Sequence, residues 1–306
     1  MRVSIIIPTY NPDEKRLAQT LDGLKNQSLG KNEWELIIID NNSSNNFQNQ
    51  LDLSWHPSAK IITETRQGLT YARLKGFNEC KGDIILMVDD DNILNSDYLG
   101  QSLSIFDKNL QLAAIGGKSL PLFEATPPVW LHEFYGNLAL RDLGNDIMIS
   151  GWDNQYPHAA PIGAGMGIRR AAIASYINKI TTGKSNISDR TGTSLSSGGD
   201  NDLVLEILKS GWQVGYFPQL QLQHIIPAQR MEVAYLARLV HNTNISWVQL
   251  LASHGINPWK KISTSGVFPR KIKAWFTYKA WKSSPDYIKW RGACGLFEGL
   301  ASLAQN

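Results

Sequence analysis

The chain has 306 residues, a formal net charge of +3 and 42% hydrophobic residues, which permits one large globular domain or a domain with a substantial appendage. Its two cysteines, Cys80 and Cys294, have no metal-ligand spacing and are too few for a disulfide framework, which favours a reducing compartment. The apolar run at the N-terminus is short and ends at Pro8, so neither a signal peptide nor a membrane-spanning helix is expected.

The charge is divided unevenly along the chain. From residue 255 to the end, nine Lys or Arg stand against two acidic residues, which leaves this segment at +7 and the remainder at −4. This asymmetry indicates two parts with different partners: a mildly acidic body and a basic tail that would be attracted to anionic lipid, nucleic acid or a phosphorylated substrate.

The first part of the chain alternates short apolar runs with amphipathic segments. Asn11, followed by Pro12 and two acids, predicts the start of the first helix, and Ser96 is expected to cap a later one. The apolar runs predict strands at residues 3–7, 35–39, 60–63, 84–88 and 113–117. Strand, helix and strand in this spacing form parallel crossover units, so we expect an α/β fold with a doubly wound, Rossmann-like, mostly parallel sheet.

The second part is less regular. Residues 121–161 are rich in aromatic residues and proline and are interpreted as excursions over the sheet. The glycines of 163–167 allow the backbone either to approach a ligand or to cross a crowded neighbour. Residues 181–199 resemble a mobile lid, and strands are expected at 214–217 and 220–223. A mainly helical extension with five tryptophans follows.

Three consecutive carboxylates end the strand predicted at 84–88. Asp89, Asp90 and Asp91 follow five large apolar residues, so they would be partly desolvated and would repel one another. A divalent cation bound by oxygen ligands would offset this cost, and open sheets place their ligands at the carboxyl ends of strands. The alternative is that the acids cap the next helix or lie in water.

Four segments, in this order and spacing, match a known family pattern: Ile5-Ile-Ile-Pro-Thr-Tyr-Asn11, Ile38-Ile-Asp40-Asn-Asn-Ser43, Gly68-Leu-Thr-Tyr-Ala-Arg73 and Val88-Asp-Asp-Asp91. Together they resemble an inverting family 2 glycosyltransferase with the GT-A fold, of the type that acts in bacterial polysaccharide or glycan biosynthesis. Segments at 163–170, 198–203 and 217–224 are also similar, so the resemblance covers roughly residues 2 to 226.

The resemblance implies a nucleotide site. Within it, Asp40 would hydrogen-bond the pyrimidine base, because a carboxylate can accept the imide N–H of uracil or thymine. The alternative for Asp40 is a turn acid. Either Asp89 or Asp90 would face the ribose and diphosphate, since the extra acid allows two alignments. The remaining residues expected near the nucleotide are Pro8, Thr9, Tyr10, Asn11, Gly68 and Arg73.

The resemblance also implies a metal and a base. Asp91 would bind Mn²⁺ or Mg²⁺, and His224 stands where some family members supply a further ligand, although a lone histidine is often structural. Asp200 occupies the position of the catalytic base, while Gly199 replaces the Glu that usually precedes it. Asp200 could instead be only a helix cap, and Asp202 is interpreted as a first-turn acid. His254 matches no part of the pattern.

The implied function is a metal-dependent inverting glycosyltransferase that moves a sugar from a UDP-sugar, or a dTDP-sugar, to a hydroxyl of a glycan or lipid-linked glycan by single displacement. Two alternatives are a catalytically inactive, glycosyltransferase-like nucleotide- or glycan-binding protein and a sugar nucleotidyltransferase. The second is disfavoured because Pro8-Thr-Tyr-Asn11 stands where such enzymes carry a glycine-rich phosphate loop.

We interpret residues 1–226 as a catalytic domain, with a nucleotide-binding half (1–118) and an acceptor half (119–226), and residues 227–306 as a basic, Trp-rich helical extension. Tryptophans interleaved with Lys and Arg suit an anionic membrane surface, but they could equally pack the extension onto the catalytic domain. No nucleic-acid-binding motif is present. The expected location is the cytoplasm, with peripheral attachment to the inner face of the membrane as an option.

Overall fold

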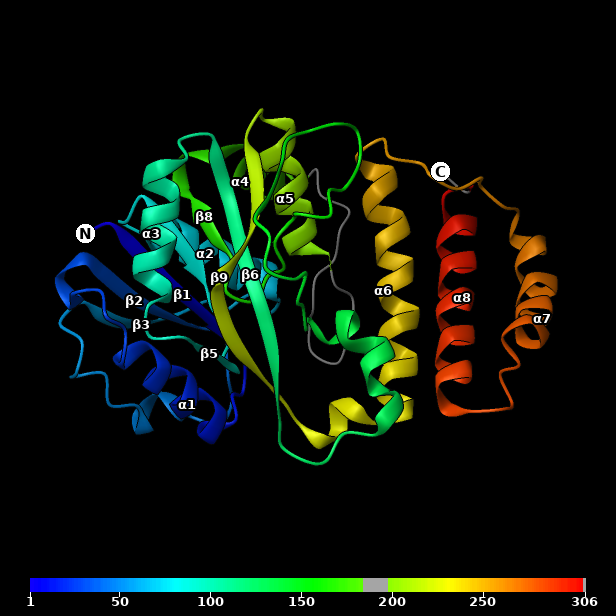
Figure 1. Ribbon diagram of the computed structural model, residues 1–306, viewed down its shortest axis with the longest axis horizontal. Helices are drawn as coiled ribbons and strands as arrows, with labels where there is room; N and C mark the ends of the chain where they lie inside the picture. Colours follow the sequence, from blue (N-terminus) through cyan, green and yellow to red (C-terminus); the bar gives the residue numbers. More distant parts are fainter. Residues whose placement is uncertain (184–197, 305–306) are drawn as a thin grey trace. The chain divides into compact units, whose positions relative to one another are not determined.

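The computed structural model describes residues 1–183 and 198–304 and divides into two units. The first contains residues 1–122, 139–183 and 203–225, and the second contains residues 123–138, 198–202 and 226–304. Figure 1 follows the chain through both. The predicted lid at 181–199 falls largely outside the described residues.

The strands of the described chain form one sheet in the order β3-β2-β1-β4-β8-β6-β9-β5, with β7 paired to β9. They are β1 (Val3–Thr9), β2 (Trp34–Asp40), β3 (Ala59–Thr63), β4 (Ile84–Met87), β5 (Asn92–Leu94), β6 (Leu112–Phe123), β7 (Met148–Ser150), β8 (Gly167–Arg169) and β9 (Gln213–Ile226). The helices are α1 (Glu14–Lys25), α2 (Leu69–Glu79), α3 (Tyr98–Lys108), α4 (Ala174–Thr181), α5 (Gly199–Lys209), α6 (Val233–Ser253), α7 (Val267–Tyr278) and α8 (Ser284–Ser302).

The sheet is mixed. Strands β3, β2, β1 and β4 are parallel neighbours, and β8 lies antiparallel to both β4 and β6, so β6 runs in the same direction as β4. Strand β9 adds antiparallel pairs with β5 and β7. The predicted α/β class is confirmed, and the C-terminal region is helical as expected.

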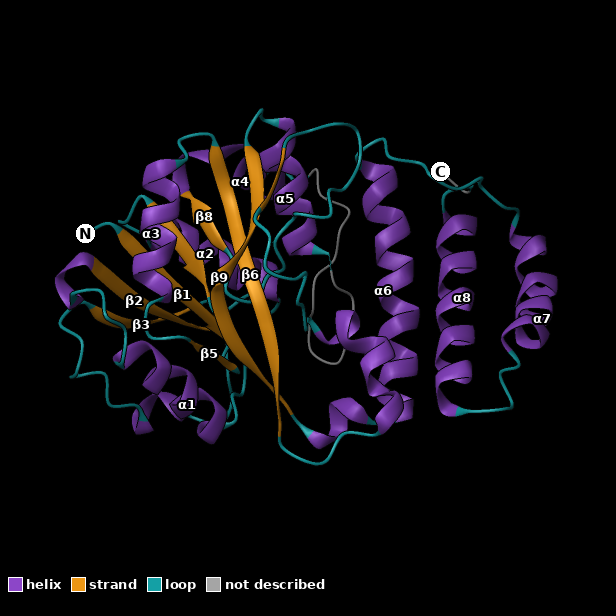
Figure 2. Cartoon of the chain, in the orientation of Figure 1, coloured by secondary structure: helices purple, strands orange, loops and turns teal. Residues whose placement is uncertain are grey.

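Alternate residues of the central strand β1 enter different cores, as the period of two in a strand requires. Val3, Ile5 and Ile7 pack with apolar residues of α1 and α3 on one face. Ile6 belongs to a second cluster with residues of α2, α4 and α5 on the other face. Figure 2 shows these strands as one twisted sheet with helices against it. A strand buried on both faces is therefore apolar along its whole length, which is the pattern that predicted it.

Several local predictions differ from the structure. Helix α1 is capped by Asp13, which accepts hydrogen bonds from the backbone N–H groups of Lys15 and Arg16, and Asn11 is not the cap. The cap of α3 is Asp97, one residue later than expected. The two strands expected at 214–217 and 220–223 are one strand, β9, which continues through Pro218.

The glycines of 163–167 serve close packing in the structure. Gly165 has φ +71°, and its carbonyl accepts a 2.7 Å hydrogen bond from the buried Tyr98 hydroxyl. A Cβ at Gly165 would lie 2.7 Å from that hydroxyl and 2.5 Å from a carbon of Leu222. Of the two interpretations left open, crowding by neighbouring elements is the one observed.

The second unit is mainly helical. Helices α6 and α8 pack closely, because Gly295 of α8 lies against the backbone of α6 and a Cβ there would come within 2.1 Å of the His241 carbonyl oxygen. Helix α7 and the 3-10 helix η3 (Val129–Leu138) also contact α8. Among the described residues, no helix is long and apolar enough to cross a membrane.

Candidate functional site

The three carboxylates lie in a tight turn between β4 and β5, at the carboxyl end of the central strands. The backbone N–H of Asn92 donates to the Asp89 carbonyl (3.1 Å), and the Asn92 side-chain oxygen accepts from the Asp89 N–H (3.2 Å). The Asn92 amide nitrogen donates to Asp91 Oδ1 (3.1 Å). Asn92 is fully buried, so it fixes the turn that presents the acids. Sequence reasoning gave it no role, although it directly follows the acid run.

Asp91, in this turn, lies beside His224 of β9. Asn92 pairs with His224 in the antiparallel ladder of β5 and β9, and the Ile225 N–H donates to the Asp91 carbonyl (2.9 Å). The ladder brings His224 Nε2 within 3.4 Å of Asp91 Oδ1, and both side chains are buried. The two residues expected to share a metal therefore converge, although they are 133 positions apart in the sequence.

Asp90 has a partner that the sequence did not suggest. The Thr9 hydroxyl, at the end of β1, donates a short hydrogen bond to Asp90 Oδ2. Thr9 is buried, whereas Asp89 and Asp90 are half-buried. The contact ties the end of β1 to the acid turn, so two segments of the recognised pattern meet directly.

Asp40 ends β2 level with Thr9 on β1. Its Oδ1 accepts from the Ser43 N–H (2.9 Å), and its Oδ2 accepts a short hydrogen bond from the Gln48 amide. The turn-acid role left open for Asp40 is therefore observed. Each carboxylate oxygen has a second lone pair, so the role does not exclude a further N–H donor.

The loops after β1 and β2 are joined through Asn11. Its backbone N–H donates to the Ser43 hydroxyl (2.8 Å), and its side-chain oxygen accepts from the Ser44 N–H (2.8 Å). Asn11 adopts φ +47°, which a short polar side chain tolerates. Pro8 is buried, while Tyr10 is exposed beside the joined loops and is free to stack on a planar ligand.

Asn41 holds the loop that precedes α2, and sequence reasoning missed it. Its amide nitrogen donates to the carbonyls of Glu64 (3.1 Å) and Arg66 (2.7 Å), and its oxygen accepts from the Gly68 N–H (2.7 Å). The Arg66 guanidinium binds both Glu64 oxygens and holds the pKa of that carboxyl below its usual range. The sequence signal that could have identified Asn41 is its place directly after Asp40.

Arg73 lies on α2 and is buried, as few arginines are. Helix α2 packs closely on β1 and β2, where a Cβ at Gly76 would lie 3.1 Å from side-chain atoms of Ile6 and Ile39. Gly68, with φ +135°, is the N-cap residue directly before this helix. A buried guanidinium on such a helix is expensive unless it is hydrogen-bonded, which sets it apart from the solvated surface charge considered as its alternative.

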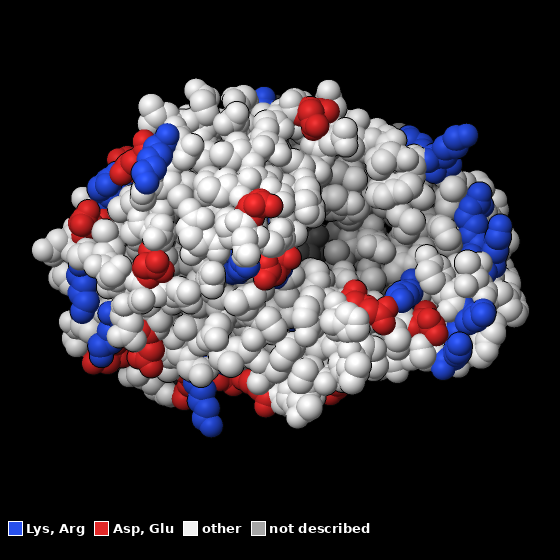
Figure 3. Space-filling model, in the orientation of Figure 1, with Lys and Arg blue, Asp and Glu red and all other residues white. Residues whose placement is uncertain are grey.

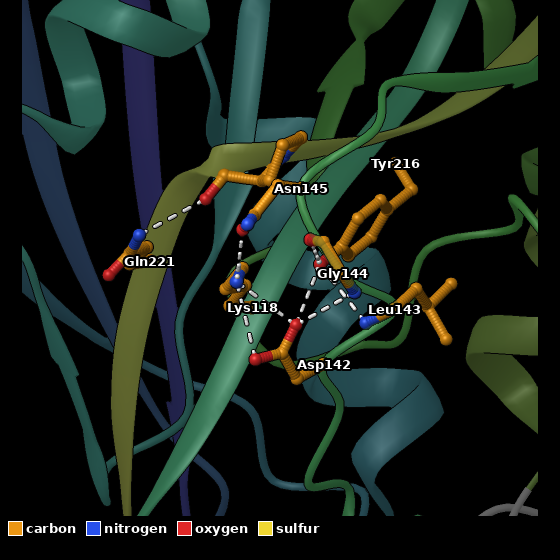
Figure 4. A network of polar contacts seen from close by, with 8 residues as sticks. Lys118, Asp142, Leu143, Gly144, Asn145, Tyr216 and Gln221 are labelled. Atoms are coloured by element: carbon orange, nitrogen blue, oxygen red, sulfur yellow. Dashed lines mark hydrogen bonds and ion pairs between the residues drawn. The ribbon is translucent and has the colours of Figure 1, made fainter.

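A second polar network joins β6, β9 and the loop at 141–145 (Figure 4). Lys118 Nζ donates to Asp142 (3.2 Å) and Asn145 (3.0 Å), and the Tyr216 hydroxyl accepts from the Leu143 N–H (3.1 Å). The Gly144 N–H and Lys118 lower the pKa of Asp142, whereas burial raises the pKa of Tyr216. The network fixes the loop to the sheet. It contains none of the residues predicted for the site.

Asp200 lies in the first turn of α5, in the second unit. In the same turn, Asp202 is almost completely buried, and its Oδ1 lies 2.6 Å from Nε2 of the buried His254 at the end of α6. Asp202 is therefore more than a dipole acid, and His254 has a structural partner that the pattern did not indicate. The role of Asp200 as a base stays a prediction.

The carboxyl ends of β1, β2 and β4 thus carry a continuous set of polar side chains. Thr9, Asp40 and Asp90 are linked by register or by hydrogen bond, and Asp91 with His224 continues the set toward β9. Oxygen and imidazole donors of this kind bind divalent cations, and the adjoining loops offer donors and acceptors to a planar ligand. Such a site suits a ligand that carries both a base and a diphosphate.

The chain is similar in sequence to known glycosyltransferases. The sequence model of "Glycosyl transferase family 2" matches residues 4–173. A poly(ribitol-phosphate) beta-N-acetylglucosaminyltransferase, TarS of Staphylococcus aureus, is 24% identical over 143 residues, which are 42% of this chain and 24% of the relative. A dolichol-phosphate mannosyltransferase of Pyrococcus furiosus is 33% identical over 93 residues, which are 30% of this chain and 26% of the relative.

Among solved structures, the S. aureus TarS fragment 1–349 in complex with UDP matches with a TM-score of 0.51 at 13% identity, covering 100% of this chain and 92% of that one. At this identity the match shows a shared fold. The match spans about a quarter of the length of each of the two curated relatives named above.

Proposed function

The chain belongs to glycosyl transferase family 2 and is a glycosyltransferase with the GT-A fold, and we propose that it transfers a sugar from a UDP-sugar, or a dTDP-sugar, to a glycan or lipid-linked glycan hydroxyl with inversion. The observation that carries the proposal is the convergence of Asp91 and His224 beside Thr9 and Asp90 at the carboxyl ends of the central strands. The relatives named above are transferases acting on poly(ribitol-phosphate) and dolichol-phosphate, which supports a polymeric or lipid-linked acceptor.

The nucleotide would lie over the loops after β1 and β2. Asp40 would accept the imide N–H of the base through a lone pair that Ser43 and Gln48 leave available, and Tyr10 is exposed beside it. The other residues proposed to border the nucleotide are Pro8, Thr9, Asn11, Gly68, Arg73, Asp89 and Asp90. Thr9 restrains Asp90, which supports Asp89 as the carboxylate that faces the ribose and diphosphate.

The donor set fits Mn²⁺ or Mg²⁺ at Asp91 and His224. Neighbouring ligands of one such cation stand about 3 to 3.5 Å apart, because each bond is about 2.0–2.2 Å long. The separation of Asp91 Oδ1 and His224 Nε2 is 3.4 Å, and both groups are buried, His224 on β9 and Asp91 directly before its partner strand β5. When bound, the cation would stabilise the negative charge that develops on the leaving diphosphate.

The transfer itself would be a single displacement. The acceptor hydroxyl oxygen attacks the anomeric carbon, the bond from that carbon to the diphosphate oxygen breaks, and the nucleoside diphosphate leaves with the bonding electrons. Asp200 is the proposed base that takes the hydroxyl proton. This role is supported by the place of Asp200 in the Gly199-Asp-Asn-Asp202 segment at the start of α5.

We propose residues 1–226 as the catalytic domain, with 1–118 for the nucleotide and 119–226 for the acceptor, and residues 227–306 as an extension that meets an anionic membrane surface. The corresponding location is the cytoplasmic side of the membrane.

The test is release of UDP from a panel of UDP-sugars with Mn²⁺ and glycan acceptors. Asp91→Asn should lower turnover by at least 100-fold, as loss of a directly bound carboxylate exceeds the 10- to 100-fold cost of outer-shell changes. The control is Asp97→Asn, an exposed acid six residues away that makes no side-chain capping bond. Undiminished turnover in Asp91→Asn would overturn the metal assignment. Nucleotide binding without turnover on every acceptor would favour a binding protein.

A further inference from the structure

Helix α7 carries a stripe of exposed apolar side chains. Phe268, Ile272 and Phe276 stand at a spacing of four residues, so they share one face of the helix. They are 71%, 45% and 63% exposed, and Trp281, just beyond the helix, is 58% exposed. A contiguous apolar stripe of this kind is unusual on a protein surface that contacts only water.

The same segment is strongly basic. Residues 267–282 contain five Lys or Arg and no acid. Lys271 is bound to Glu298 of α8 (2.5 Å), whereas four others are exposed: Arg270, Lys273, Lys279 and Lys282. Figure 3 shows blue side chains gathered over the part of the view that α7 and α8 occupy in Figure 1.

The apolar stripe is not needed to hold α7 in place, because a different face does so. Ala274 is buried, Trp275 packs edge-on against Trp290 of α8 (4.8 Å between ring centroids), and Trp290 Nε1 donates to the Lys271 carbonyl (3.0 Å). The tryptophans of the extension therefore divide. Trp275 and Trp290 pack within the unit, while Trp281 remains exposed. The packed pair joins two helices of the extension to each other, an arrangement that neither interpretation left open by the sequence had described.

We propose that α7 and the turn after it, residues 267–282, form the surface that docks on an anionic phospholipid bilayer. Phe268, Ile272, Phe276 and Trp281 enter the boundary between headgroups and acyl chains, and the exposed Lys and Arg meet the lipid phosphates. This deepens the membrane partner proposed above for residues 227–306 and rests on it. The helix is already folded and anchored on α8, so docking does not require the cost of ordering it.

Charge argues for a lipid surface over a second copy of the chain. Two such stripes facing each other would bring the same four unneutralised cations together, which is repulsive. An anionic bilayer supplies the complementary charge as well as an apolar phase.

The experiment is sedimentation of the full chain with vesicles of phosphatidylcholine alone or with added phosphatidylglycerol. We expect binding that needs phosphatidylglycerol and weakens with salt. Replacing Phe268, Ile272 and Phe276 together by Ser should weaken binding more than tenfold. Each exposed cation changed to Gln should cost about fivefold at low salt. The matched control replaces Leu110, Ile147 and Ile149 by Ser, three residues elsewhere that are 72%, 56% and 43% exposed.

Circular dichroism confirms that each variant is folded. Equal vesicle binding by the α7 variant and the wild type would overturn the proposal, and so would a concentration-dependent dimer abolished by the same three changes. The vesicles contain neither donor nor acceptor, and Asp91→Asn should bind them as the wild type does. Failure of docking is thereby distinguished from failure of the proposed transfer.

Discussion

Changing Asn92 to Asp tests both the geometry of the acid turn and the cation proposed for it. The amide nitrogen of Asn92 donates a 3.1 Å hydrogen bond to Asp91 Oδ1, and Asn92 is fully buried. Asn92→Asp keeps the shape and replaces that donor by a second carboxylate oxygen. The matched control, Asn92→Leu, removes the hydrogen bonds without adding charge.

The size of the effect follows from the distance. Two unit charges 3.1 Å apart repel by about 5 kcal/mol at an effective dielectric constant of about 20. The variant can avoid this repulsion by protonating one of the two carboxylates, so the loss of stability cannot exceed the free energy of protonation. From a reference pKa of about 3.9, protonating one Asp costs about 5 kcal/mol at pH 7.5 and about 2 kcal/mol at pH 5.5. In Asn92→Asp, the repulsion would raise the pKa of the two neighbouring carboxyls in the folded state above their unfolded value. The loss of stability is therefore present above the unfolded pKa and becomes smaller as the pH falls.

The free energy of unfolding is measured with urea, at both pH values, with Mn²⁺ or with EDTA. In EDTA at pH 7.5 we expect Asn92→Asp to be less stable than Asn92→Leu by several kcal/mol, with a smaller difference at pH 5.5. Mn²⁺ should remove most of the difference, because a divalent cation between two carboxylates converts repulsion into attraction. Equal stability of the two variants in EDTA would refute the turn geometry. A penalty that Mn²⁺ leaves unchanged would refute the metal site.

Three further predictions concern stability, each measured by urea unfolding. Burial, reinforced by a nearby lysine, lowers the pKa of His56 to about 4, so His56 stays neutral in the fold and its contribution is lost as the pH falls below 6.5. Lowering the pH from 7.5 to 5 should reduce the free energy of unfolding of the wild type by about 2 kcal/mol through His56, and that of His56→Phe by less. Equal reductions in the two proteins would contradict this. Gly165→Ala should destabilise the fold by about 2–4 kcal/mol for two reasons: the backbone of residue 165 is left-handed, and the new Cβ would lie 2.7 Å from the Tyr98 hydroxyl. An unchanged free energy of unfolding would show that the neighbouring side chains can move to make room. Asp202→Ala should cost about 2–4 kcal/mol by leaving His254 buried without its carboxylate. Asp146→Ala, at an exposed acid outside the helices and strands, should cost less than about 0.5 kcal/mol.

The sequence predicted the sheet because its strands are buried on both faces. Ile5, Ile6 and Ile7 are apolar whichever core they enter, so a continuous apolar run indicates the strand without indicating its direction. The antiparallel insertion of β8 between β4 and β6 could not be read in this way, because direction depends on where the long excursion before residue 167 returns to the sheet. Pro218 likewise did not divide β9.

The candidate site divides in the same manner. The acid run and Asp40 were identifiable because each stands at the end of an apolar strand, and strand ends in such sheets face one edge. Asn11 was identifiable only through the family resemblance. The partners of these residues were not identifiable. The hydrogen bond from Thr9 to Asp90 joins residues 81 positions apart. The hydrogen bond from the Gly68 N–H to the Asn41 side chain likewise joins two loops that are distant in the sequence.

What the sequence by itself determined is the alternation of strands and helices, the motifs at the strand ends and the basic character of the tail, since all of these reside in neighbouring residues. What only the tertiary structure decided is which distant groups meet without a sequence signal: Thr9 with Asp90, His254 with Asp202, and the division of the tail's tryptophans into packed and exposed. The physical reason is that register and packing, which no short stretch encodes, set every contact between elements.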